Sequence, residues 1–132
     1  METSMYVQVT EGIKITVKTF YRPEYSDPRR NNYLFSYHIK IENQSDYAVQ
    51  LLRRHWYIFD SNGEYREVEG KGIIGEQPIL EPGELHEYES ACNLSTEIGK
   101  MYGTYLMERQ MDNIRFKVNI PEFHMVAPHR LN

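Results

Sequence analysis

The segment Gly70-Lys71-Gly72-Ile73-Ile74-Gly75 has the spacing G-x-G-x-x-G, and residues of this kind could bind the phosphates of a nucleotide. In a dinucleotide-binding domain this spacing follows a strand and opens a helix, whose first amides face the pyrophosphate. Here a predicted strand precedes the glycines, but Pro78 and Pro82 follow them and would interrupt a helix. The sequence therefore argues against a Rossmann-type site at this segment.

A smaller anion site at the same glycines stays open. Glycines can turn successive backbone N–H groups toward an anion without a helix, and Lys71 would add a positive charge. In the alternative interpretation, Gly70, Gly72 and Gly75 only let the loop bend, while the two isoleucines between them cover the end of the domain. A lone glycine motif is a weak signal, which favours the bending role. Gly70, Lys71, Gly72 and Gly75 remain the candidate phosphate-binding residues.

The histidines, the acidic residues and the cysteine are the candidate metal ligands of the chain. The five histidines are His38, His55, His86, His124 and His129. No pair of them has zinc-type spacing, and Cys92 has no partner cysteine. The four glutamates between residues 81 and 89 could bind a hard cation, but they fit no ligand loop and are better explained as a solvated acidic face. We expect no bound metal and no cofactor.

The run Arg53-Arg54-His55-Trp56 places basic residues beside an aromatic ring, as in proteins that bind single-stranded nucleic acid. Alternation along a strand sends Arg53 and His55 to one face and Arg54 and Trp56 to the other, so no single patch forms. We expect Trp56 in the core or at its rim, with the arginine stems covering apolar surface. A lone Cys92 is typical of a small buried hydrophobe. No catalytic acid, base or nucleophile can be identified from spacing, so an enzyme is not predicted, and neither is nucleic-acid binding.

The bulk properties are those of one domain spanning residues 1–132. The chain is 40% hydrophobic and 26% charged, with a net charge of −4. Such a charge gives no general reason to bind nucleic acid or anionic lipid. The single cysteine forms no internal disulfide, and neither a membrane-spanning run nor a signal peptide is recognisable. We therefore expect a cytoplasmic protein that does not insert into a membrane.

Hydrophobic periodicity of two runs along nearly the whole chain and predicts the elements that position these residues. The predicted strands cover residues 5–9, 13–18, 33–42, 47–59, 64–68, 85–90, 103–108 and 115–120. Turn signals separate them, including Asn43-Gln44-Ser45-Asp46 between the third and fourth strands and a type II turn at residues 81–84. Residues 94–101 are predicted to hold at most one helical turn. Residues 70–83 are predicted to be an ordered, non-helical connection with at least one of its motif glycines at positive φ. Seven to eight antiparallel strands favour an all-β, immunoglobulin or fibronectin type III-like β-sandwich, with a barrel as the alternative.

A longer pattern surrounds the glycines and resembles the ApaG family over about half of the chain. The matching residues are His55-Trp56-x-Ile58, Gly63, Val68-x-Gly70-x-Gly72-Ile73-Ile74-Gly75-Glu76-Gln77-Pro78-x-Leu80-x-Pro82-Gly83, Tyr88-x-Ser90, Leu94-x-Thr96 and Gly99-x-Met101-x-Gly103-x-Tyr105-x-Met107. Three features depart from the family pattern: His86 replaces an aromatic residue, Ala91 replaces a glycine, and residues 109–113 replace an acidic, Gly-containing turn.

The resemblance implies a fibronectin-type sandwich and a bacterial protein associated with Co²⁺ resistance and Mg²⁺ efflux. Related domains in eukaryotic F-box and polymerase-interacting proteins look like protein-interaction modules, and the glycine run has prompted proposals of pyrophosphate binding. We therefore predict a non-enzymatic binding module with an unidentified protein partner, and self-association stays open. The alternative is a pyrophosphate- or nucleotide-binding protein that uses the loop from Gly70 to Gly75.

Overall fold

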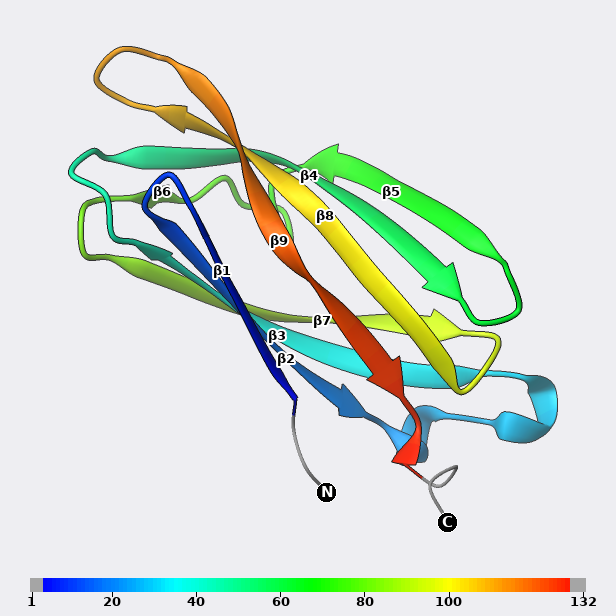
Figure 1. Cartoon of the computed structure of the whole chain (residues 1–132). Coiled ribbons are helices and arrows are strands. Elements are labelled where there is room, and N and C mark those ends of the chain that lie inside the picture. Colours follow the sequence, from blue (N-terminus) through cyan, green and yellow to red (C-terminus); the bar gives the residue numbers. More distant parts are fainter. Residues whose placement is uncertain (1–3, 129–132) are drawn as a thin grey trace.

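The computed structural model describes residues 4–128, which form nine strands and two short 3-10 helices (Figure 1). The strands are β1 (Met5–Thr10), β2 (Ile13–Tyr21), β3 (Tyr33–Asn43), β4 (Val49–Asp60), β5 (Tyr65–Lys71), β6 (Ile79–Leu80), β7 (Leu85–Leu94), β8 (Ile98–Arg109) and β9 (Arg115–Val126). The helices η1 (Pro23–Tyr25) and η2 (Pro28–Arg30) lie between β2 and β3. No helix within residues 4–128 has the length and apolar character needed to cross a membrane.

Two antiparallel sheets form the layers of a β-sandwich (Figure 1). The first sheet has the order β1-β2-β3-β7 and the second has the order β5-β4-β8-β9, with β6 paired to β4. The predicted sandwich is confirmed, and eight of the nine strands correspond to predicted segments. The ninth, β6, was missed because its two residues are too few to show alternation.

The alternating residues of the central strands form the core between the sheets. Ile15 pairs with Ile41 and Val17 with Ile39, and all four side chains are fully buried. Their polar neighbours point to the other face of the sheet, as the period of two requires. The predicted one-sided burial of residues 13–18 and 33–42 is therefore confirmed.

The connection between β7 and β8 contains no helical turn. Leu94 ends β7 and Ile98 begins β8, and the prediction allowed residues 94–101 at most one such turn. The carboxylate of Asp60 accepts hydrogen bonds from the amides of Ser95 (2.7 Å) and Thr96 (3.1 Å). These bonds satisfy the turn's amides directly. The predicted type II turn is present, with Gly83 at φ 87° and the Glu84 amide donating to the Glu81 carbonyl at 2.9 Å.

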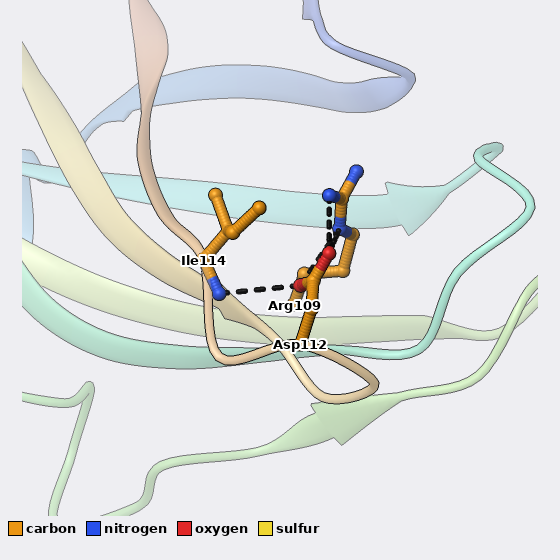
Figure 2. A network of polar contacts seen from close by, with 3 residues as sticks. All are labelled: Arg109, Asp112 and Ile114. Carbon is orange, nitrogen blue, oxygen red and sulfur yellow. Dashed lines mark hydrogen bonds and ion pairs between the residues drawn. The ribbon is translucent and has the colours of Figure 1, made fainter.

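Side-chain contacts hold the turn between β8 and β9, where the sequence departs from the family pattern (Figure 2). Arg109 Nε lies 3.0 Å from each carboxylate oxygen of Asp112, and the Ile114 amide donates to the same carboxylate at 3.2 Å. The hydrogen bonds from Arg109 hold the pKa of Asp112 below its ordinary value. Asn113 takes a left-handed conformation (φ 59°), which asparagine tolerates better than most residues. The turn therefore closes without a glycine.

Candidate functional site

The motif glycines lie partly in β5 and partly in the turn after it. Gly70 and Lys71 are the last residues of β5 and pair with Arg54 and Arg53 of β4. Gly72 (φ 62°) and Gly75 (φ 74°) have positive φ, whereas Gly70 does not. The prediction of at least one positive φ is confirmed. The predicted connection over residues 70–83 is interrupted, because its first two residues belong to β5 and Ile79–Leu80 form β6.

A two-residue turn closes the loop at Ile73 and Glu76. The Ile73 amide donates to the Glu76 carbonyl at 2.8 Å, and the Glu76 amide donates back at 2.9 Å. Both central residues have positive φ, Ile74 at 45° and Gly75 at 74°, as in a type I′ hairpin turn. The Gly72 amide donates to the Leu52 carbonyl at 2.8 Å and ties the loop to β4.

These hydrogen bonds limit what the loop offers an anion. The amides of Gly72, Ile73 and Glu76 already donate to protein carbonyls. Among the described residues, the amides of Ile74 and Gly75 have no protein acceptor. Phosphate binding by Gly70, Lys71, Gly72 and Gly75 stays a prediction, with two adjacent amides and the exposed Lys71 available for it.

The guanidinium group of Arg54 lies directly against the glycine loop. Its Nη1 donates to the carbonyl of Gly72 at 2.9 Å and to that of Lys71 at 3.2 Å. A Cβ on Gly70 would lie 3.1 Å from Arg54 Nη1, so a glycine leaves room for this side chain. The predicted alternation is confirmed here, because Arg54 and Trp56 face the same side of β4. The contact between Arg54 and the loop was not predicted. The placement of Arg54 on the same face of the strand as Trp56 was the sequence feature that could have indicated it.

Arg54 lines a cavity of about 290 Å³ between the two sheets, which we call the inter-sheet cavity. β4 and β5 contribute Arg54, Trp56 and Arg66, while Ser90 and Cys92 come from β7 of the other sheet. Within the described chain, the two arginines are the lining residues with formal charge. Neither forms an ion pair with a carboxylate of residues 4–128.

The hydroxyl and thiol groups of the inter-sheet cavity stay protonated at neutral pH. Burial raises the pKa of Tyr88, and its hydroxyl is hydrogen-bonded to that of the fully buried Tyr105. Burial likewise raises the pKa of the Cys92 thiol, against a smaller opposing effect of Arg66. Since a thiolate is the reactive form of cysteine, this raised pKa leaves Cys92 in its less reactive form at neutral pH. With these groups neutral, the two arginines give the cavity a positive charge.

Stacked rings occupy the opposite, outer face of the second sheet. We call this surface the aromatic face and define it by His55, Tyr57, Phe59, Tyr65 and Tyr102. Tyr57 and Tyr102 are paired across β4 and β8, and their rings stack at 5.1 Å and 19°. Tyr57 also stacks on His55 at 4.5 Å, and Phe59 lies 4.9 Å from Tyr65. The rings are partly or largely exposed, which distinguishes them from the core aromatics.

The edge strand β5 adds acidic groups to the aromatic face. Glu67 accepts hydrogen bonds from the Tyr65 hydroxyl and from His55, whose Nε2 lies 2.8 Å away. These bonds lower the pKa of Glu67, and the hydrogen bond between Tyr65 and Glu67 raises the pKa of Tyr65 to about 12. Glu67 is therefore an anion at neutral pH beside the rings.

The histidines and glutamates of residues 4–128 form no metal-binding cluster. His86 is the predicted departure on β7, and its Nε2 lies 3.9 Å from Glu76 of the loop. Within residues 4–128, no group of three or more His, Cys, Asp or Glu side chains is placed to hold a metal ion. His129 lies outside the described residues.

Replacing Ile74 with asparagine is expected to raise the free energy of unfolding by about 1 kcal/mol. A left-handed conformation costs an ordinary residue roughly 1–2 kcal/mol, and asparagine bears it more easily. The Ile74 side chain is 66% exposed, so little burial is lost. Urea unfolding would measure the change. Ile79→Asn is the control, because Ile79 is 51% exposed and has no positive φ. Equal effects of the two substitutions would contradict the strain assigned to Ile74.

Comparison with known proteins identifies the family. Residues 23–109 match the family model of the ApaG domain. A "Protein ApaG" from Anaeromyxobacter dehalogenans is 49% identical over 97% of this chain and its own entire length. A "Protein ApaG" from Paramagnetospirillum magneticum is 46% identical over the same shares. The crystal structure of a Bordetella pertussis protein named ApaA superposes with a TM-score of 0.85 at 41% identity, covering 88% of this chain and 94% of that one. The chain therefore belongs to the ApaG family.

Proposed function

We propose that the protein is a non-enzymatic binding module that docks a partner protein on its aromatic face. The observation that carries the proposal is the set of partly exposed rings, most of them stacked on one another, on the outer face of β4, β5 and β8. Aromatic residues are enriched at protein interfaces and among the residues that supply most of the binding energy.

Pre-organisation favours the aromatic face as an interface. Tyr102 stacks on both Tyr57 (5.1 Å) and Phe59 (5.8 Å), so the free protein already holds these rings in one arrangement. The strands beneath them are central members of the sheet, which fixes the backbone. Rings that are ordered before binding lose little side-chain entropy on docking.

The charges around the rings define the chemistry of the partner. Glu67 and Glu69 of β5 flank His55, and the whole chain carries a net charge of −4. A complementary partner segment presents apolar side chains for the rings and arginine or lysine for the glutamates. Arginine suits this surface best, because its guanidinium group can stack on an aromatic ring and also pair with a carboxylate.

The proposal extends to the cellular role that the family implies. We propose that the protein acts in the cytoplasm and contributes to Co²⁺ resistance and Mg²⁺ efflux through this partner. A docked partner connects the domain to cation transport without an ion bound to the domain itself. The phosphate-binding alternative at Gly70, Lys71, Gly72 and Gly75 is a separate proposal that the aromatic face does not support.

Quantitative affinity capture tests the protein-binding proposal. We expect the amount of the main partner recovered with the double variant Tyr57→Ser/Tyr102→Ser to be about ten-fold lower, or more, than the amount recovered with the unaltered chain. Loss of interface residues that supply most of the binding energy predicts such a decrease. The matched control is Val7→Ser/Val9→Ser, which alters two exposed residues (46% and 54%) on β1 of the other sheet. Thermal melting of each purified variant checks that the fold is retained.

The identity of the lost protein decides the outcome. A partner that both variants retain, or that only the β1 variant loses, would rule out the aromatic face as the docking surface. A partner lost by the Tyr57/Tyr102 variant alone would support the proposal, and Glu67→Gln should also bind that partner more weakly than the unaltered chain does. That single substitution removes the charge but leaves the rings in place.

A further inference from the structure

We propose that the inter-sheet cavity binds a small organic acid, with its carboxylate on Arg54 and its apolar body against Trp56. This site lies between the sheets, on the opposite side of β4 from the aromatic face, and the inference is independent of the protein-binding function. It is also distinct from the candidate phosphate loop, which would use backbone amides and Lys71.

The charge of the inter-sheet cavity selects an anion. Arg54 and Arg66 line it, and no acidic side chain of the described chain does. Arg66 also lines an adjoining hollow, together with Asp60 and Glu64, and it is exposed to solvent. Arg54 is half-buried and has no carboxylate partner within the described chain, and a bound anion would supply that partner.

Arg54 is held in position by two hydrogen bonds and still has hydrogen-bond donors available for a ligand. Its Nη1 donates to the carbonyls of Lys71 and Gly72, which fixes the guanidinium plane. Its Nε and Nη2 have no acceptor among the described residues. These two nitrogens form one edge of the guanidinium group, which is the geometry that binds a carboxylate with two parallel hydrogen bonds.

The strand register places apolar side chains between the two arginines. On β4 and β5 the inward-facing pairs are Arg54 with Gly70, Trp56 with Val68, and Ile58 with Arg66. Four residues along a strand correspond to about 13 Å, so the arginines flank a stretch formed by Trp56 and Val68. A bare phosphate would leave that apolar stretch uncovered, whereas an organic acid would fill it.

Arg66 and the loop border the inter-sheet cavity. Arg66 is anchored to β7 of the other sheet through the Asn93 carbonyl and through Cys92 Sγ at 3.4 Å. Ile74 lines the cavity while holding a φ of 45°, an uncommon conformation for a β-branched residue. Strained residues of this kind cluster at ligand sites. The volume of about 290 Å³ corresponds to a compact ligand, at the lower limit of ordinary small-molecule pockets.

Titration of the full chain with three matched probes tests the proposal. Cyclohexanecarboxylate supplies both the acid and the body, cyclohexanecarboxamide lacks the charge, and inorganic phosphate lacks the body. Trp56 is the chain's one tryptophan and lines the inter-sheet cavity, so its fluorescence reports binding, and amide chemical shifts locate it. We expect the carboxylate to bind with a Kd of about 1 mM or tighter and at least ten-fold more tightly than either other probe.

The variants separate the inter-sheet cavity from the loop. Arg54→Gln should abolish the preference for carboxylate over carboxamide. Arg53→Gln, one residue away on the opposite and exposed face, should preserve it, and so should Lys71→Ala. Arg66→Gln provides a second test inside the cavity if Arg54→Gln fails to fold. The proposal would be overturned if the carboxylate bound no more tightly than the carboxamide or than phosphate, or if it did not bind at all. It would also be overturned if Lys71→Ala abolished the preference for carboxylate while Arg54→Gln and Arg66→Gln preserved it.

Discussion

Replacing Gly72 with alanine is expected to lower the free energy of unfolding by about 3 kcal/mol. The residue has φ 62°, which costs an alanine roughly 1–2 kcal/mol. A Cβ at this position would also lie 2.1 Å from the carbonyl oxygen of Glu76, so backbone must shift. That oxygen accepts the hydrogen bond from the Ile73 amide, and its displacement costs about 1 kcal/mol more.

Two neighbouring glycines provide matched comparisons for Gly72. Gly75 has φ 74° but no atom within 4 Å of a Cβ, so Gly75→Ala should cost about 1 kcal/mol from φ alone. Gly70 lacks positive φ, and its Cβ would meet the tip of Arg54, which can move. Gly70→Ala should therefore have the smallest effect of the three on stability.

Urea unfolding of the three variants measures this ranking without any ligand present. The order of destabilisation should be Gly72 first, Gly75 second and Gly70 last. Equal losses at Gly72 and Gly75 would show that the overlap with Glu76 is relieved without cost. A Gly72→Ala variant of unchanged stability would refute the steric role of this glycine altogether.

Much of the fold could be predicted because the chain alternates so regularly. Each of Ile13, Ile15 and Val17 is fully buried, and a period of two identifies this face without any partner strand. The same rule placed Arg54 beside Trp56. It failed for β6, which is too short to alternate, and it carries no information on how Asp60 satisfies the turn between β7 and β8.

Only those features of the site that lie within a single strand or turn could be predicted from the sequence. A positive φ at one or more of Gly70, Gly72 and Gly75 was expected from local chain geometry, and Gly72 and Gly75 have it. The inter-sheet cavity instead joins Arg66 of β5 to Cys92 of β7, which lie in different sheets. Their meeting depends on how the layers pack, and no local period carries that information. The same limit applies to Tyr102, which joins the aromatic face through the register of β8 on β4.

Asn43 shows how a residue expected in a turn can become part of the core. The sequence placed it at the start of a turn, but it ends β3 and is fully buried. Its Nδ2 donates to the carbonyls of Tyr47 (2.7 Å) and Leu80 (2.9 Å). Its Oδ1 accepts from the amide of Ser45 at 3.0 Å. One side chain thus connects the β3–β4 turn to β6, which belongs to the other sheet.

Replacing Asn43 with alanine is expected to lower the free energy of unfolding by about 3 kcal/mol. The substitution takes the Nδ2 donor from the buried Leu80 carbonyl and the Oδ1 acceptor from the Ser45 amide, at roughly 1–3 kcal/mol for each unsatisfied group. The Tyr47 carbonyl still accepts from the Ser45 hydroxyl at 3.1 Å. Urea unfolding at neutral pH would measure the loss. Asn119→Ala is the control, since Asn119 is exposed on β9 and its side chain has no hydrogen-bond partner among the described residues, while its backbone amide donates to the Thr10 hydroxyl at 3.2 Å. Similar effects of the two substitutions would contradict the role given to Asn43.

The substitution Asn43→Asp separates lost hydrogen bonds from lost volume, because the shape is kept while the donors are removed. At neutral pH the introduced carboxylate would face the carbonyl oxygens of Tyr47 and Leu80, which accept but cannot donate. Its pKa in the folded protein should therefore rise above the unfolded value of about 3.9. A raised pKa gives stability that is fully present below the unfolded pKa and is lost as pH rises through the folded pKa. Relative to the unaltered chain, the variant should then be much less stable at pH 7 and recover part of the difference near pH 4, where a protonated carboxyl can donate to one carbonyl. An unchanged difference between these two pH values would show that the donors of Asn43 are not what the sandwich requires.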